Sequence, residues 1–372
     1  MILQHVRTRA FRNLQDPRVE LSPRTTVLFG PNGQGKTNFL EACYLLCTLR
    51  PLRAQKLIEL VRLGERAALV AGAFEMPGGV REVEVEVSGQ GREARLDGKR
   101  AADPDELFGG LATVAFTPDD LGVVKQGPEG RRRLLDRAVQ NRHPAHLADA
   151  REYARALRAR NQLLRQGAEP ALLESFDEPL ARFGARLRER REAVLDEMRP
   201  PAQGAFAQVA RGEAELGIEY LAAGRESDDL AGPDADLRER LLRALRRRLG
   251  RDRERGYTSV GPHADDLGLA IGEKSARLYA SQGQARAVVL ALKIGEIENL
   301  RRAQGRSPLL LLDDVSSELD PQRSAWLMAY LSGLRGQVVL TTTDPRILAQ
   351  GLDEEALFRG VSEGRIEPAP AP

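Results

Sequence analysis

One stretch near the N-terminus limits what this chain can fold into: Gly30-Pro31-Asn32-Gly33-Gln34-Gly35-Lys36-Thr37, followed by Asn38. Residues 25–29 before it are β-branched and apolar and predict a short buried strand. Residues 38–42 after it predict the start of a helix. A strand, a glycine-rich turn ending in Gly-Lys-Thr and a helix together are typical of a phosphate-binding P-loop.

The residue types of this stretch suit a nucleoside triphosphate. Glycines let the backbone turn so tightly that successive N–H groups point at one place, and the helix N-terminus adds partial positive charge there. Lys36 can reach the β- and γ-phosphates, and the Thr37 hydroxyl can ligate Mg²⁺. We therefore predict that residues 30–38 bind ATP with Mg²⁺.

Length and composition are those of a soluble protein with about two domains. The chain has 372 residues, of which 42% are hydrophobic and 30% charged. No apolar run approaches the roughly 20 residues that a membrane span needs, and the N-terminus lacks the features of a signal peptide. Cys43 and Cys47 share one face of the helix after the P-loop, and we interpret them as core residues. These features favour the cytoplasm, with no membrane partner.

The charge distribution leaves two interpretations open. The net charge is only +2, but arginine is concentrated in the middle third, for example at 131–133, 186–191 and 243–255. These runs could contact nucleic acid. Much of the arginine alternates with glutamate, so a solvated helix face with ion pairs explains any single run about equally well.

The pattern of the chain changes at Pro118. Residues 69–74, 80–87 and 111–116 predict strands, and the second of these alternates strictly between valine and charged residues. Residues 129–255 read as almost wholly helical, with breaks at Gly167, at Pro200-Pro201 and around 224–233. From Gly256 the globular pattern returns. We predict an α/β head of residues 1–120 and 256–372 with an antiparallel β subdomain, and an inserted α-helical arm of residues 121–255.

The C-terminal third completes the predicted head. Its expected strands are residues 267–271, 276–279, 309–312 and 338–342, and its expected helices are residues 282–303 and 322–332.

A second chemical feature is Asp313-Asp314, directly after four leucines at 309–312. Four leucines predict a fully buried parallel strand, and open α/β sheets bind ligands at the carboxyl ends of such strands. Asp313 can hold Mg²⁺ as a Walker B acid, and Asp314 lies where a base could polarise the attacking water. We therefore predict Lys36, Asp313 and Asp314 as catalytic residues, with Thr37 and Asp313 as metal ligands.

Two further motifs follow the P-loop in the sequence. Ser281, Gly283 and Gln284 stand at the start of a predicted long helix, where a serine and a helix N-terminus can bind phosphate. An ordinary serine N-cap is the alternative. Because the P-loop already holds one set of phosphates, this second site makes sense if it caps a nucleotide bound by another subunit. Residues 316–320, Ser-Ser-Glu-Leu-Asp, follow the aspartates, and an ordinary polar loop is their alternative.

In this order, the four motifs resemble an ABC-type ATPase head of the kind found in SMC and double-strand-break repair ATPases. Three stretches resemble the RecF family of bacterial recombination mediators in particular: residues 116–136, 260–265 and 312–323. The resemblance covers the head from end to end. The helical insertion matches in length and position more than in motif.

The resemblance implies an ATP-dependent DNA-binding protein. Two subunits would sandwich two ATP molecules, each held by one P-loop and by the partner's Ser281 motif. The dimer would grip DNA, favour junctions of double- and single-stranded DNA, and help load recombinase with RecR and RecO. Weak, DNA-stimulated ATP hydrolysis would release it. The rival interpretation is an ABC-type head of another chromosome-maintenance or transport machine.

Three positions depart from the pattern of most ABC ATPases. Asp314 stands where most of them have glutamate, and a shorter carboxylate predicts slow hydrolysis. No histidine follows residues 338–340, so we expect a hydroxyl, that of Thr343, to sense the γ-phosphate. No glutamine fills the usual Q-loop, and residues 117–121 are expected to serve instead.

Overall fold

The structure is a computed structural model of the chain, and it describes residues 1–16, 18–54, 56–101, 111–210, 214–224, 236–314, 320–346, 352 and 355–371. Backbone contacts divide the chain into two compact units. The head unit comprises Met1–Asp120 and Glu296–Pro372, and the arm unit comprises Leu121–Gly295. The arm unit takes residues 256–295, which the sequence assigned to the head. The domain boundaries at 121 and 255 therefore stay a prediction.

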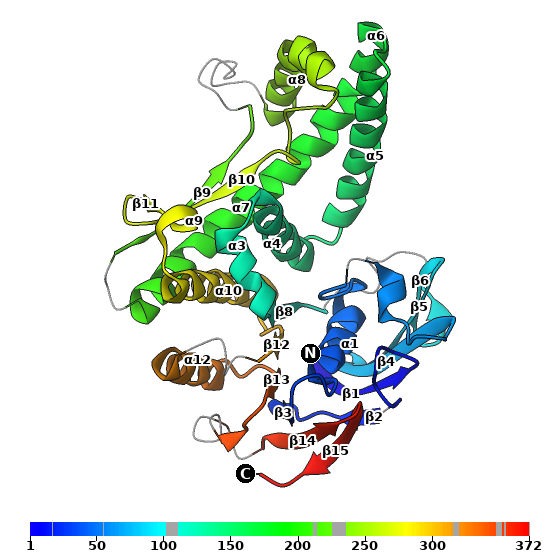
Figure 1. Cartoon of the computed structure of the whole chain (residues 1–372), viewed down its shortest axis with the longest axis vertical. Helices are drawn as coiled ribbons and strands as arrows, with labels where there is room; N and C mark the ends of the chain where they lie inside the picture. The colour runs from blue at the N-terminus through cyan, green and yellow to red at the C-terminus, as the bar shows by residue number, and fades with distance from the viewer. Residues whose placement is uncertain are drawn as a thin grey trace. The chain divides into compact units, whose positions relative to one another are not determined.

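The head unit contains two six-stranded sheets (Figure 1). One sheet is antiparallel, in the order β2-β1-β4-β5-β6-β7. The other has the order β15-β14-β3-β13-β12-β8, in which β14 to β8 run parallel and β15 is antiparallel. The strands of the antiparallel sheet are β1 (Ile2–Arg9), β2 (Arg18–Glu20), β4 (Ala67–Met76), β5 (Gly79–Ser88), β6 (Gly91–Leu96) and β7 (Lys99–Arg100). Those of the mixed sheet are β3 (Thr25–Phe29), β8 (Thr113–Phe116), β12 (Leu309–Leu312), β13 (Val338–Thr342), β14 (Leu357–Ser362) and β15 (Arg365–Ala369).

Helix α1 (Lys36–Thr48) lies between the two sheets and packs against strands of both. Its buried residues share one core with Leu309 and Leu311, on one face of β12. On the other face of the mixed sheet, Val338 and Leu340 line a small hollow together with residues of α12 (Pro321–Gly333). The two helices therefore cover opposite faces of the mixed sheet (Figure 1). Cys43 and Cys47 are buried free thiols in the α1 core, which confirms their predicted role. The described residues of the head unit also form the short 3₁₀ helices η1 (Leu57–Leu60) and η2 (Pro118–Asp120).

The arm unit combines helices with a small antiparallel sheet in the order β11-β10-β9. Its first helices are α3 (Leu121–Lys125), α4 (Pro128–Arg142), α5 (His146–Arg165), α6 (Pro170–Glu174), α7 (Asp177–Val209) and α8 (Leu237–Arg255). The remaining elements are β9 (Leu216–Leu221), β10 (Asp266–Ile271), β11 (Lys274–Ser275), α9 (Ala276–Tyr279) and the start of α10 (Gln282–Gln304). No helix among the described residues is long and apolar enough to span a membrane.

Helix α7 corrects the predicted break at Pro200-Pro201, because it continues through both prolines. Two prolines remove two backbone donors, which normally kinks or ends a helix. Met198 before the pair and Ala202 after it are both buried, so one packed stripe runs across the break. Tertiary packing of this stripe outweighs the local penalty.

The small sheet corrects two further predictions. Residues 216–221 form strand β9 inside the stretch that we predicted as helical, and its partner β10 lies about 45 residues later in the chain. Pairing with β10, which is distant in the sequence, therefore decides that residues 216–221 form a strand. Residues 276–279, predicted as a strand, form the short helix α9, which ends where the Ala280 N–H donates to the Ala276 carbonyl at 3.1 Å.

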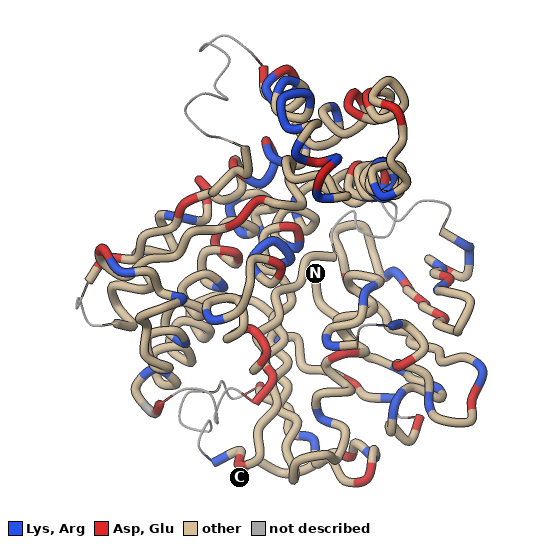
Figure 2. The backbone as a smooth tube through the Cα atoms, turned by 45° about the horizontal axis from the view of Figure 1, so that its top comes forward, with Lys and Arg blue, Asp and Glu red and all other residues tan. Residues whose placement is uncertain are grey.

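Buried ion pairs connect the helices of the arm unit. Arg160 is fully buried and donates to Asp177 at 3.1 Å and to Asp252 at 2.9 Å. Arg188 grips both carboxylate oxygens of Asp265 at 2.6 and 2.8 Å. Figure 2 shows basic and acidic residues interspersed along the helices rather than separated. The arm unit has 32 Lys and Arg and 26 Asp and Glu, so ion pairing still leaves it a net positive charge.

Candidate nucleotide site

The P-loop has the predicted strand–turn–helix form. Strand β3 ends at Phe29 and α1 begins at Lys36. Gly30, Gly33 and Gly35 have φ angles of 150°, 79° and 115°, which residues with a side chain rarely adopt. A Cβ on Gly30 would lie 2.3 Å from the Val361 carbonyl oxygen, so packing as well as φ demands glycine there. The space around the Gly33 Cα is open, with no atom within 4 Å of an added Cβ.

The Lys36 ammonium lies inside this loop. Its Nζ donates to the carbonyl oxygens of Gly30 at 2.6 Å and Pro31 at 2.8 Å, and the residue is 6% exposed. Burial lowers the pKa of Lys36, while the carboxylates of Asp314 and Asp313 raise it. The loop therefore holds a cation at its centre, where a bound triphosphate would offer stronger acceptors than two carbonyls.

Thr37 and Asp313 meet although 276 residues separate them in the chain. The Thr37 hydroxyl donates to Asp313 Oδ1 at 2.7 Å. Asp313 is 4% exposed, and burial raises its pKa, opposed by the hydroxyls of Thr37 and Thr341. These two oxygens fit Mg²⁺, which binds through one or two protein oxygens plus substrate phosphates. No cluster of three or more His, Cys, Asp or Glu side chains that could cage a metal occurs among the described residues.

Thr341 lies in the stretch 341–344, where the sequence predicts a hydroxyl that senses the γ-phosphate, but its contacts with the two aspartates were not predicted. Its hydroxyl donates to Asp313 Oδ1 at 2.9 Å and accepts from the Asp314 N–H at 2.9 Å. It therefore orients both aspartates from the neighbouring strand β13. Asp314 has φ 49°, so its backbone turns sharply out of the strand direction. Thr343, the predicted γ-phosphate sensor, is exposed, and its role stays a prediction.

Arg53 is a second unpredicted residue. Its guanidinium lies 3.9 Å from Asp313 Oδ2 and 3.5 Å from Asp119 Oδ2. The buried Glu41 of α1 fixes the backbone beside it, because Glu41 Oε1 accepts from the Arg53 N–H at 3.0 Å. Arg12 donates to the other Glu41 oxygen at 2.8 Å. The loop after α1 thus places the Arg53 guanidinium near Asp313, the predicted Walker B acid.

The C-terminal hairpin of β14 and β15 also contacts the P-loop. Gln34 Oε1 accepts from the Glu363 N–H at 2.6 Å, and the Gln34 carbonyl accepts from the Gly364 N–H at 2.9 Å. A Cβ on Gly364 would lie 2.0 Å from the Asn13 carbonyl oxygen. Asn13 in turn donates to the Gly33 carbonyl at 3.3 Å. A turn signal at Glu363-Gly364 is visible in the sequence, but its contact with a loop 330 residues earlier is not.

The Ser281 motif belongs to the arm unit, whereas the P-loop belongs to the head unit. The Ser281 hydroxyl accepts from the Gln284 N–H at 3.1 Å, and Gln284 Oε1 accepts from the Ser281 N–H at 2.9 Å. This reciprocal pair is a capping box at the start of α10. Lys125 also donates to the Ala280 carbonyl. Ser281 is exposed, and a phosphate contact by it, Gly283 or Gln284 stays a prediction.

The fourth motif is only partly visible. Residues 315–319 lie outside the described residues. Asp320 caps α12 by accepting from the N–H groups of Gln322 and Arg323, each at 3.1 Å.

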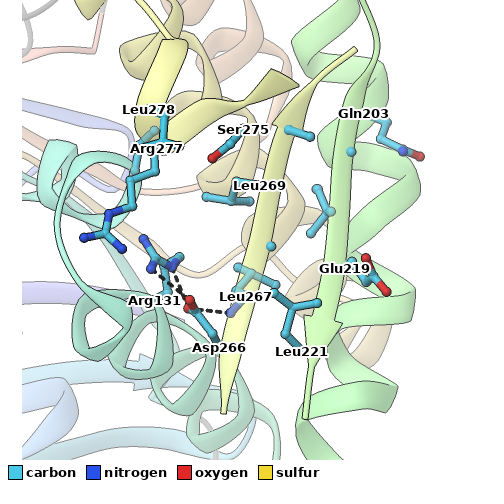
Figure 3. A pocket seen from close by; sticks show the side chains of 15 residues that line it. Arg131, Gln203, Glu219, Leu221, Asp266, Leu267, Leu269, Ser275, Arg277 and Leu278 are labelled. Atoms are coloured by element: carbon cyan, nitrogen blue, oxygen red, sulfur yellow. Dashed lines mark hydrogen bonds and ion pairs between the residues drawn. The ribbon is translucent and has the colours of Figure 1, made fainter. Parts of the chain in front are cut away.

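The arm unit has a separate hollow of about 710 Å³ along β9, β10 and α9 (Figure 3). At its wall Arg131 points at Asp266 and makes two bonds, at 2.7 and 3.0 Å. Arg131 is therefore engaged in an ion pair, while Arg277, also in the lining, is exposed.

Comparisons with known proteins show the family of this chain. The family described as the RecF/RecN/SMC N terminal domain matches residues 2–363. The chain is 56% identical to the DNA replication and repair protein RecF of Anaeromyxobacter sp. (strain K), over 99% of both chains. It is 52% identical to the same protein of Myxococcus xanthus (strain DK1622), over 97% of both. The chain belongs to the RecF family.

Solved structures support the fold of this RecF-family chain. A structure of the recombination mediator protein RecF with ATP, in the RecFOR pathway, superposes with a TM-score of 0.87 at 30% identity, covering 99% of this chain and 98% of that one. An SMC head bound to the C-winged helix domain of ScpA superposes with a TM-score of 0.57 at 15% identity, covering 99% and 97%, and shows the shared fold alone. The predicted ABC-type ATPase fold and the predicted family are both confirmed. The rival interpretation as the head of another machine is set aside by the full-length family match.

Proposed function

We propose that this RecF-family chain is an ATP-dependent DNA-binding protein of recombinational repair that works as an ATP-sandwiched homodimer. The observation that carries the proposal is the cluster of Lys36, Thr37 and Asp313 at the carboxyl edge of the mixed sheet. The ATP complex of the RecF relative supports the choice of nucleotide.

Each residue of the cluster has a distinct task in the proposal. Lys36 neutralises the β- and γ-phosphates, and backbone N–H groups at the start of α1 hold the remaining oxygens. Thr37 and Asp313 would hold Mg²⁺, which neutralises charge on the phosphates when bound. Asp314 positions the attacking water, and its short side chain on a left-handed backbone makes hydrolysis slow. ATP hydrolysis then acts as a switch rather than a source of rapid turnover.

The dimer follows from the second phosphate motif. Ser281, Gly283 and Gln284 stand at the exposed N-terminus of the 23-residue helix α10. In a head-to-tail pair, the N–H groups of this helix would meet the γ-phosphate held by the partner's P-loop. ADP lacks that phosphate, so it should not support the pair.

DNA contact is proposed to come from arginines of the head and arm that point to solvent. Contacts to phosphates position a protein without reading sequence, so sequence preference should be weak. A preference for junctions of double- and single-stranded DNA, and cooperation with RecR and RecO in loading recombinase in the cytoplasm, are proposed from the family alone. The RecF relative solved with ATP is described as a recombination mediator in the RecFOR pathway.

The experiment is fluorescence anisotropy of a labelled gapped duplex with ATP, ADP or no nucleotide. We expect tight binding only with ATP, and a slope of log Kd against log salt of about 0.9 per phosphate contact. In Asp314→Asn, the ATP-bound complex should persist longer because hydrolysis is slower. Tight binding that ignores both nucleotide and salt would contradict the proposal.

A further inference from the structure

The head unit has a second concave surface, a hollow of about 800 Å³ whose lining includes five arginines. We name it the arginine hollow after these residues, which are Arg24, Arg301, Arg302, Arg306 and Arg335. Among the residues that the structure describes, the acidic members of its lining are Glu298 and Glu355. The hollow therefore carries an excess of positive charge.

The arginine hollow is distinct from the nucleotide site because it lies at the opposite edge of the mixed sheet. Its lining includes Arg24, directly before β3, and Gln337, directly before β13. The P-loop follows the carboxyl end of β3, and the aspartates follow the carboxyl end of β12, which runs parallel to β3 in the same sheet. Strands of four or five residues at about 3.3 Å per residue separate the two edges by roughly 15 Å.

The described lining of the arginine hollow carries more guanidinium groups than carboxylates. Glu298 Oε1 already accepts from Arg301 at 2.9 Å and from the Tyr330 hydroxyl at 2.7 Å. Arg302 and Arg335 are exposed at the rim. Arg301 is itself paired, since its guanidinium donates to both Glu298 oxygens at 2.9 and 3.2 Å, so a partner would first meet the exposed Arg302 and Arg335. Five guanidinium groups against two carboxylates give the described lining a net positive charge, which an anionic partner would neutralise.

The floor of the arginine hollow is fixed before any partner arrives. The buried Gln337 side chain accepts from the Leu3 N–H at 2.7 Å and donates to the carbonyls of Leu3 and Ser22, both at 2.8 Å. Arg335 sits on a left-handed turn with φ 30°, which lifts it to the rim. The cations are thus displayed on a rigid base, and little order must be created on binding.

The residue types and the openness of the arginine hollow favour some classes of anionic partner over others. Its described residues include no aromatic side chain, so they offer no stacking surface to the bases of a single strand. It is mostly polar and open at the rim, whereas small-molecule pockets are mainly apolar and bury most of their ligand. A carboxylate-rich peptide suits both properties, because guanidinium forks bind carboxylates bidentately and the peptide backbone can remain in solvent.

We propose that the arginine hollow is a docking site for an acidic peptide segment of a protein partner. Arg302 and Arg335 at its rim make the first contacts, and Arg24, Arg301 and Arg306 complete the cationic lining. This site is separate from nucleotide binding, so its partner can remain bound in either nucleotide state.

The test uses a fluorescein-labelled hexapeptide of alternating aspartate and glutamate, with its Asn/Gln counterpart as the uncharged control. Anisotropy is measured on the full chain in wild type and in Arg302→Glu/Arg335→Glu. The matched control is Arg9→Glu/Arg100→Glu, which makes the same charge change at two exposed residues of the antiparallel sheet. ATP affinity is measured in parallel as a check on folding and on the nucleotide site.

We expect the acidic peptide to bind wild type and to lose at least about tenfold in affinity in the hollow variant, because charge-assisted pairs are reversed. The control variant should bind as wild type does, and ATP affinity should be unchanged in all three proteins. The proposal is overturned if the acidic peptide binds no better than its amide counterpart, or if both double variants lose affinity equally. It is also overturned if a labelled single-stranded oligonucleotide, but not the peptide, loses affinity in the hollow variant.

Discussion

The P-loop and the interior of the arm unit both hold charged side chains away from solvent, but they do so in opposite ways. Lys36 is held by the carbonyls of residues five and six positions earlier. Arg160 and Asp252, by contrast, lie 92 positions apart, and Arg188 and Asp265 lie 77 apart. The loop presents its cation through local geometry, whereas the arm satisfies its cations through tertiary contacts.

The two kinds of contact distinguish charged residues that are available to bind a ligand from charged residues that stabilise the fold. Arg131, Arg188 and Arg191 belong to runs that the sequence left open as DNA contacts or ion-paired surface. All three are buried and bonded to aspartates. They therefore stabilise the arm rather than contact DNA, and arginine density alone is a poor guide to a nucleic-acid surface.

Removing the buried carboxylate of Asp265 should cause the largest loss of stability among these predictions, because it disrupts the ion pairs inside the arm unit. This fully buried carboxylate accepts from Arg188, from the Tyr220 hydroxyl at 2.6 Å and from the Ala223 N–H at 2.8 Å. Asp265→Ala leaves a buried cation without its partner, so we expect a loss of about 3–5 kcal/mol in the free energy of unfolding by urea titration. In Arg243→Ala, which removes an exposed pair on one helix, the loss should stay below about 0.5 kcal/mol. Equal losses in the two variants would refute the distinction.

Removing the P-loop cation should act on binding and not on folding. Lys36→Ala deletes a charge that donates hydrogen bonds to two loop carbonyls, so we expect the unfolding transition to move little. ATP affinity should fall by about 100-fold or more, or about 2.7 kcal/mol, in isothermal titration calorimetry. Lys99→Ala, at an exposed residue of β7, serves as the control. A folded Lys36→Ala protein with unchanged ATP affinity would show that the loop is not the nucleotide site.

Substituting a single glycine of the C-terminal hairpin tests whether contacts with the backbone position the P-loop. Gly364 and Gly98 both have positive φ, at 80° and 78°, so alanine strains the backbone similarly at each. Only at Gly364 would the new Cβ collide, with the Asn13 carbonyl oxygen, while the space around Gly98 is open. We expect Gly364→Ala to lower ATP affinity about tenfold, or about 1.4 kcal/mol. If Gly98→Ala weakens ATP binding as much, the hairpin does not position the loop.

The smallest effect concerns pH and the buried His263 of the arm. Burial lowers the pKa of His263 below its usual 6.5, opposed by the Thr258 carbonyl and Asp265. The folded state therefore favours neutral histidine, and its stabilising contribution is present above pH 6.5 and lost as the pH falls through the folded pKa. Unfolding free energy should decline between pH 7 and 5 by at most about 1.4 kcal/mol per pH unit from this group. The decline should be shallower in His263→Gln, and identical slopes would contradict this assignment.

The sequence predicts the features that local residue patterns determine, and it misses those that depend on partners distant in the chain. Strands β3, β12 and β13 have the bounds that apolar runs predicted, and the P-loop and the aspartates lie together as expected. Residues whose role depends on distant partners were missed, including Thr341, Arg53 and the Glu363-Gly364 turn. Strand β9 and the unbroken helix α7 were missed for the same reason, because tertiary packing decides both. The stretch 260–265 resembled the family, but only the structure shows that it anchors ion pairs.

The central claim is that ATP joins two copies of this chain through the P-loop of one and the Ser281 motif of the other. Static light scattering of wild type and Ser281→Arg, each with Mg²⁺ and ATP, ADP or no nucleotide, tests it most directly. We expect wild type to double in mass only with ATP. Ser281→Arg should stay monomeric in all three conditions while binding ATP nearly normally, since the new side chain would clash with the partner's nucleotide. A wild type that stays monomeric with ATP at high concentration, or a Ser281→Arg protein that still dimerises, would contradict the account.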